Sequence, residues 1–207
     1  MFGIFNLDSP IGRAMNTVAD VMILSVLWLV CSLPIFTAGA ATTALYYASI
    51  RSVRQEGSVF KDFFRAFRDN FRQSLGATAL FGAVALIVIG DFWVLSRVSI
   101  AGGNGLRIVL YAVIFLTVMT AGYFFPLLAR FEGTIKQHLK NSFLLAMSYP
   151  VVTVVMTALN GAPILLFLYN PQWFFRVLPV FTILWTGGAA HINARLLLKI
   201  FEKTHKK

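Results

Sequence analysis

The sequence has little negative charge and a single cysteine. Its 207 residues include eight Asp and Glu against 18 Lys and Arg, and charged residues make up only 13% of the chain. The hydrophobic share is 58% and the mean hydropathy is +0.76, which excludes a water-soluble surface and with it a soluble enzyme core. Because Cys31 is alone in an apolar run, an intramolecular disulfide and a multi-cysteine metal site are also excluded.

Motifs of catalysis are missing as well. The chain has no GxxxxGK[ST] phosphate loop, no GxSxG, no HExxH and no CxxC, and its three histidines are far apart in sequence. His138 lies in a polar loop without a second ligand at metal-binding spacing, so we expect it to be exposed. We therefore expect no enzyme, no cofactor and no metal site. The net charge of +10 indicates membrane orientation rather than nucleic-acid binding.

Five apolar stretches are long enough to cross a bilayer, whose hydrocarbon core of about 30 Å needs roughly 20 helical residues. They are residues 18–40, 74–96, 106–129, 142–162 and 173–194. Pro34 predicts a kink in the first span, because proline lacks a backbone donor. The run 160–163 is expected to interrupt the fourth stretch, with a short interfacial piece or a kinked continuation after it. The sequence thus predicts one all-α membrane domain over residues 1–207.

Positive charge is concentrated in alternate loops. The segments after the first, third and fifth spans hold six, three and five of the 18 Lys and Arg, which leaves four for the other side. Short loops rich in Lys and Arg stay in the cytoplasm. This predicts a multi-pass protein with its amino terminus outside and its carboxyl terminus in the cytoplasm.

The first cytoplasmic loop contains an amphipathic segment, residues 59–72. Five aromatic residues fall on one helical face and two arginines lie on the remaining surface, namely Phe60, Phe63, Phe64, Phe67 and Phe71 with Arg65 and Arg68. One interpretation is an interfacial connector whose Phe face lies in lipid or against the protein's own helices. The other is a docking helix that binds a partner through its aromatic face.

Four polar residues lie within or at the ends of the spans: Asp20, Asp91, His191 and Asn193. The two carboxylates are expected at the outer interface, either hydrated at headgroup level or lining a shallow vestibule. The other two approach the cytoplasmic interface, where an interhelical hydrogen bond is expected. The small residues 187–190 before them predict close helix packing. No charge is expected at mid-membrane, which fits a secondary transporter poorly.

Two stretches carry a family resemblance. Residues 27–47 read LWLVCSLPIFTAGAATTALYY and residues 62–71 read DFFRAFRDNF. These motifs resemble the YesL-like family of small bacterial membrane proteins of unknown function, found in Gram-positive bacteria beside genes for carbohydrate uptake. The resemblance is clearest over about the first 75 residues and supplies no catalytic residues.

The resemblance implies an accessory subunit of a carbohydrate ABC importer in a bacterial plasma membrane. This subunit would act in assembly, stability or gating and contact lipid and the permease subunits. The chain lacks the EAA-type loop with which a sugar permease contacts its ATPase, so it is not expected to be a permease. Two alternatives remain: an independent small transporter or channel, built as a homo-oligomer, and a membrane sensor that partners a two-component system.

Overall fold

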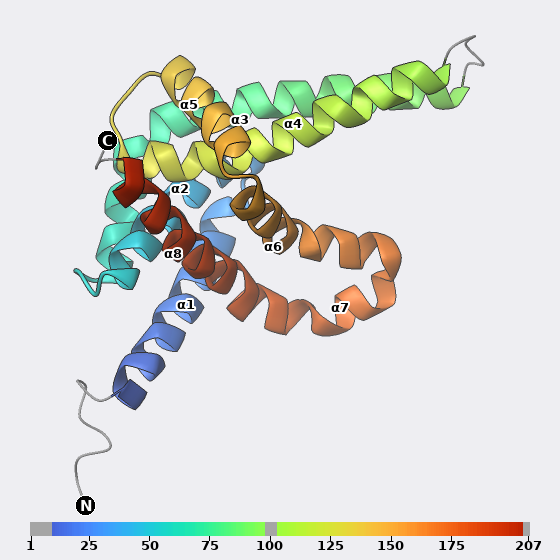
Figure 1. Cartoon of the computed structure of the whole chain (residues 1–207). Coiled ribbons are helices and arrows are strands. Elements are labelled where there is room, and N and C mark those ends of the chain that lie inside the picture. The colour runs from blue at the N-terminus through green and yellow to red at the C-terminus, as the bar shows by residue number, and fades with distance from the viewer. Residues whose placement is uncertain (1–9, 98–102, 205–207) are drawn as a thin grey trace, which may run out of the picture.

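The computed structural model describes residues 10–97 and 103–204, and none of these residues is in a β-strand (Figure 1). The helices are α1 (Pro10–Ser32), η1 (Ile35–Thr37), α2 (Ala38–Val53), α3 (Val59–Arg97), α4 (Gly103–Arg130), α5 (Ile135–Ser148), α6 (Pro150–Tyr169), α7 (Pro171–Val180), η2 (Phe181–Trp185) and α8 (Thr186–Thr204). By length and composition α1, α3, α4 and α6 could each cross a membrane, and the bent pair α7 and α8 makes a fifth candidate. The predicted all-α membrane fold is confirmed.

Helices α1 and α2 form an antiparallel hairpin. Near its turn, Trp28 Nε1 donates a hydrogen bond to Thr42 Oγ1 at 3.1 Å. At its open end, Ser52 Oγ donates to Asp20 Oδ2 at 2.6 Å. The middle of α1 therefore lies beside the end of α2. Asp20 was expected across the membrane from the basic loop that follows α2, and this expectation is wrong because Asp20 touches the end of α2 itself.

The single kinked span predicted for residues 18–40 is also wrong, because the chain reverses at Pro34. Helix α1 stops at Ser32, and Pro34 adopts an extended conformation with φ −75° and ψ 115°. The last carbonyls of a helix have no partner within the helix. Here Thr37 Oγ1 lies 2.6 Å from the Cys31 carbonyl oxygen and 2.7 Å from that of Pro34, so its hydroxyl closes the turn.

Helix α3 unites the predicted amphipathic helix and the second span. Its 39 residues form one helix about 58 Å long. Segment 59–72 is therefore not a separate helix, and its Asp62 pairs with Arg51 of α2 at 3.2 Å. Just beyond it, Thr43 Oγ1 of α2 lies 3.0 Å from Ser74 Oγ. The predicted spans 74–96 and 106–129 fall inside α3 and α4, which extend side by side as a two-helix arm in Figure 1.

The fourth predicted span, residues 142–162, begins at the wrong place. The chain breaks before Pro150, which occupies the first turn of α6, where a missing N–H costs nothing. Pro163 lies inside α6, so the interruption expected at residues 160–163 does not end the helix. The fifth predicted span, 173–194, falls within α7, η2 and α8.

The core is built around α2, which packs against α1, α3 and α8. The small residues at the start of α8 allow a close approach of α8 to α1. Gly187 N–H donates to Ser25 Oγ at 2.8 Å, and a Cβ at position 187 would collide with the carbonyl oxygen of Val21. The close packing predicted for residues 187–190 is confirmed.

Candidate functional site

Three uncharged polar side chains from three helices meet inside the bundle. Asn193 of α8 donates through Nδ2 to the Tyr46 hydroxyl of α2 and to Asn160 Oδ1 of α6, each at 3.2 Å. Asn193 is completely buried and Tyr46 is buried. Asn160 lies about 15 Å from either end of α6, which places it midway along a helix that could cross the membrane. We refer to Tyr46, Asn160 and Asn193 as the polar trio.

The polar trio includes a donor hydrogen and an acceptor oxygen that make no hydrogen bond within the part of the chain that the structure describes. The buried Asn193 Oδ1 accepts no hydrogen bond. The Asn160 side chain is exposed; its Oδ1 accepts from Asn193 and its amide also hydrogen-bonds to the Tyr46 phenol, which leaves at least one of its two Nδ2 hydrogens open. An amide group without a partner in apolar surroundings costs about 2–7 kcal/mol. The open amide of Asn160 is therefore expected to bind water or a ligand within the bilayer.

A cavity of about 510 Å³ lies beside the polar trio, and Tyr46 and Asn160 form part of its wall. Two indole rings, those of Trp28 and Trp185, line it as well. Both rings use their N–H groups within the protein, the second by donating to the Leu159 carbonyl at 3.0 Å. The rest of the lining is apolar, small or hydroxyl-bearing, and no Asp, Glu, Lys, Arg or His belongs to it.

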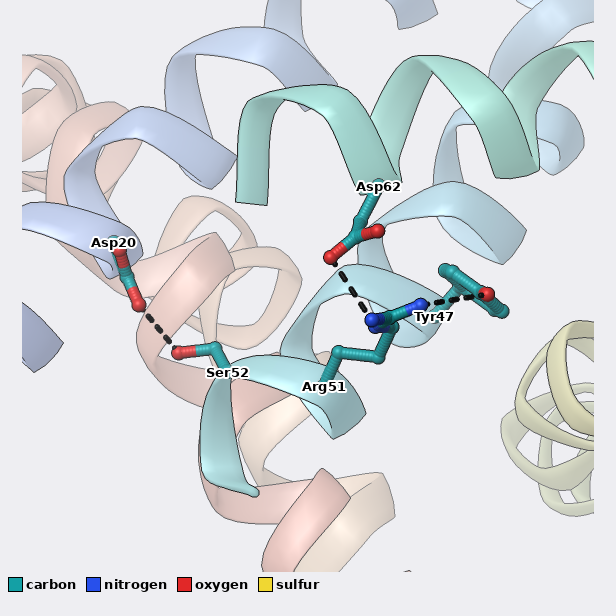
Figure 2. A network of polar contacts seen from close by, with 5 residues as sticks. All are labelled: Asp20, Tyr47, Arg51, Ser52 and Asp62. Atoms are coloured by element: carbon teal, nitrogen blue, oxygen red, sulfur yellow. Dashed lines mark hydrogen bonds and ion pairs between the residues drawn. The ribbon is translucent and has the colours of Figure 1, made fainter. Parts of the chain in front are cut away.

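A second polar cluster lies at the end of the bundle where α2 leads into α3 (Figure 2). Arg51 Nε lies 3.2 Å from Asp62 Oδ2, and Arg51 Nη1 lies 3.5 Å from the Tyr47 hydroxyl. The loop reaches this ion pair through Gly57, whose φ of +71° favours glycine and whose Cβ, if present, would lie 2.5 Å from Asp62 Oδ2. The cluster fastens α3 to α2, which is a structural role.

The four polar residues predicted in or near the membrane are not all brought together. Asn193 makes the interhelical hydrogen bonds that were expected. His191, one turn from the close contact of α8 with α1, is buried with neither ring nitrogen hydrogen-bonded, and the charges of Asp20 and Arg195 act on it. Asp20 and His191 therefore lie at neighbouring places on α1 and α8.

Asp91 is remote from this group. It is exposed near the end of α3, 29 residues beyond Asp62, which corresponds to about 43 Å along the helix. Since Asp20 lies beside the end of α2, the shallow vestibule, one of the two alternatives for Asp20 and Asp91, is wrong: the two carboxylates belong to opposite ends of the bundle.

The predicted aromatic face of α3 divides into an inner and an outer side. Phe63 is completely buried and Phe67 packs against the same core cluster. Phe60 and Phe64 remain 54% and 43% exposed, and their rings pack edge to face with centroids 5.0 Å apart. Phe71 is partly buried, while Arg65 and Arg68 are exposed.

Histidine 138 was expected to be exposed, and this is wrong. Its side chain is only 3% exposed and packs edge to face on Phe124 of α4. Burial lowers the pKa of His138, and a hydrogen bond with the Gly133 backbone opposes the shift in part. Across residues 10–97 and 103–204, no group of three or more His, Cys, Asp or Glu could hold a metal ion.

Most of the cavity was missed by sequence reasoning. Asn160 was noted only as part of a helix break, although a span that starts at Pro150 would have placed it at the centre. No sequence pattern marks Tyr46, Trp28 and Trp185 as part of a site, because aromatic residues are common in apolar helices. Their meeting depends on the α1–α2 hairpin, which the sequence left unrecognised.

These features define a multi-pass helical membrane protein with an uncharged polar cavity among its helices. The model of a family described as "Protein of unknown function, DUF624" matches residues 21–92 of the chain. The match runs from α1 through the hairpin and along most of α3, and it includes the stretches that carry the YesL-like resemblance. No curated protein and no solved structure matches the chain.

Proposed function

We propose that this chain is a non-enzymatic accessory subunit of a carbohydrate ABC importer in the plasma membrane of a Gram-positive bacterium, acting in assembly, stability or gating. Its resemblance to YesL-like proteins supports the carbohydrate importer as the partner. The family that matches residues 21–92 has no described function, so the case for a docking role rests on the surface of α3.

The observation that carries the proposal is the outer side of the α3 aromatic face. Phe63 and Phe67 hold the helix on the core, so Phe60 and Phe64 are presented on a fixed scaffold. Arg65, whose side chain is 70% exposed, lies beside them and pairs only loosely with Asp69, at 3.9 Å. Aromatic and arginine side chains supply most strong anchors of protein interfaces. This surface suits a permease subunit with a groove at the membrane boundary.

The proposal includes an orientation with both termini in the cytoplasm. The hairpin brings the middle of α1, at Asp20, to the end of α2; α3 then leads away from this end of the bundle and α4 returns to it. The charges of Arg54, Glu56 and Glu202 act on Arg130, so the ends of α2, α4 and α8 lie together. With this end in the cytoplasm, all but three of the 18 Lys and Arg residues are inside, as the positive-inside rule favours.

Affinity purification in mild detergent tests the accessory role, with the tagged protein taken from its own host grown on plant polysaccharide. We expect two sugar permeases and an ATPase to co-purify in stoichiometric amounts. Phe64→Ser should lower their recovery at least fivefold, because it removes an anchor. Phe175→Ser is the matched control, since this side chain is 62% exposed on α7. Recovery of the chain alone, or equal loss in both variants, would overturn the proposal.

A second candidate is an independent transporter built from several copies of the chain. The polar trio favours it, because transporters bind substrate near mid-membrane on polar groups. Flux of a labelled sugar into liposomes that contain only this protein discriminates between the two functions. Flux that falls in Asn160→Leu would favour the transporter, and absence of flux would leave the accessory subunit.

A further inference from the structure

The cavity beside the polar trio combines three properties that together define a ligand. It holds about 510 Å³, within the usual range of small-molecule sites. Its wall has no ionisable acid or base other than the Tyr46 phenol. It also carries an open hydrogen-bond donor, the Asn160 Nδ2 hydrogen that Tyr46 does not take, midway along α6.

We propose that this cavity binds an uncharged amphiphile from the membrane, a molecule with a hydroxyl or carbonyl head group on a hydrocarbon tail. The head group places its oxygen on the Asn160 Nδ2 hydrogen that the polar trio leaves open. The indole faces of Trp28 and Trp185 and the small residues of α4 enclose the adjoining carbons.

The wall composition excludes charged head groups. A phosphate, carboxylate or ammonium group would enter a site without a counter-charge, and the burial of an unpaired charge costs far more than that of a neutral group. A hydroxyl or carbonyl group loses little free energy on entering the cavity, because a hydrogen bond to Asn160 replaces one to water. The site therefore discriminates by charge and accepts neutral molecules.

A second, adjoining cavity offers space for the hydrocarbon tail of the amphiphile. It holds about 480 Å³ between α6 and the α7–α8 segment, and it shares Leu159, Trp185 and Ala189 with the first. Its wall consists of apolar side chains and a glycine. A hydrocarbon chain whose head reaches Asn160 can follow this second wall, where it gains the contacts that apolar surfaces offer each other.

Photolabelling of the full chain in lipid nanodiscs tests the proposal. The probe is hexadecanol that bears a diazirine on its chain, and labelled peptides are identified by mass. We expect labels on residues 118–125 of α4 and 157–164 of α6. Unlabelled hexadecanol should compete at least fivefold better than hexadecyl phosphate or hexadecylammonium, because only the neutral head group suits the wall.

Two variants and a control decide the result. Asn160→Leu removes the donor, and Gly122→Leu fills the cavity, since a Cβ at position 122 meets open space. Each should lower labelling of these peptides at least fivefold. Gly82→Leu on α3 also enters open space and lies outside the cavity, so it should leave labelling unchanged. Equal labelling in all variants, or equal competition by the charged amphiphiles, would overturn the proposal. Because no importer is present, the accessory role is tested separately.

Discussion

At the scale of single residues, buried histidine 138 makes the stability of the protein depend on pH. Burial lowers its pKa below the ordinary value near 6.5, so the unfolded chain takes up a proton at a higher pH than the folded chain. Stability is therefore full above about pH 6.5 and falls as the pH drops from there toward the lowered folded pKa. We expect the melting temperature in detergent to decrease between pH 7.5 and pH 5.5.

The matching substitution is His138→Gln, which removes the titrating group and keeps a polar side chain. It should lower stability at pH 7.5 and reduce the decrease between pH 7.5 and pH 5.5. His191 remains in both proteins, so its contribution cancels when the two pH profiles are compared. An identical pH dependence in wild type and variant would show that His138 is not the titrating group.

Individual residues also show how far the site could be predicted from the sequence. Asn193 was found because an amide in an apolar helix needs a partner, and the structure supplies Tyr46 and Asn160. Tyr46 was missed because a tyrosine in an apolar segment needs no polar explanation. Asp20 was noted but assigned to the wrong end, because its neighbour Ser52 is distant in sequence.

At the scale of elements, hydropathy predicted the helices and proline decided where the predictions went wrong. A proline in an apolar run can kink a helix, end it or start it. Pro34 reverses the chain, Pro150 begins α6 and Pro163 lies within it. Contacts between helices choose among these outcomes, such as the hydrogen bond from Trp28 to Thr42 that holds the hairpin. The stretches predicted within α3 and α4 each fall inside one helix, because Pro126 does not interrupt α4.

The contact of α1 with α8 gives a prediction at this scale. Gly187→Ala places a methyl group against the Val21 carbonyl oxygen and should separate the two helices, at a cost of about 1–3 kcal/mol. Gly188→Ala is the control, because its Cβ would meet only the Val21 side chain at 3.9 Å. Thermal unfolding in detergent should show a lower melting temperature for the first variant alone. Equal melting temperatures would mean that the helices adjust without loss.

At the scale of the whole molecule, the helices form a compact core with extended parts. The core surrounds α2, while the α3–α4 arm and the α6–α7 turn extend away from it (Figure 1). Only 11% of the apolar windows of α3 and α6 is buried within the chain. Such surfaces need lipid or partner helices to cover them. The whole-molecule arrangement thus leaves room for both proposals, docking at one end of α3 and an amphiphile between the helices.

The arrangement as a whole also predicts the orientation of the chain in the membrane. If both termini are cytoplasmic, a cysteine near the start of α1 is protected in intact cells from a membrane-impermeant maleimide. In a Cys31→Ser background, Met15→Cys should label only after the membrane is permeabilised, and Asn104→Cys, at the start of α4, should label at once. Both side chains are exposed, so reagent access depends on the side of the membrane. Labelling of Met15→Cys alone in intact cells would mean that the whole chain is inverted. Labelling of both cysteines in intact cells would require the hairpin to open, since Asp20 and Ser52 could not then meet.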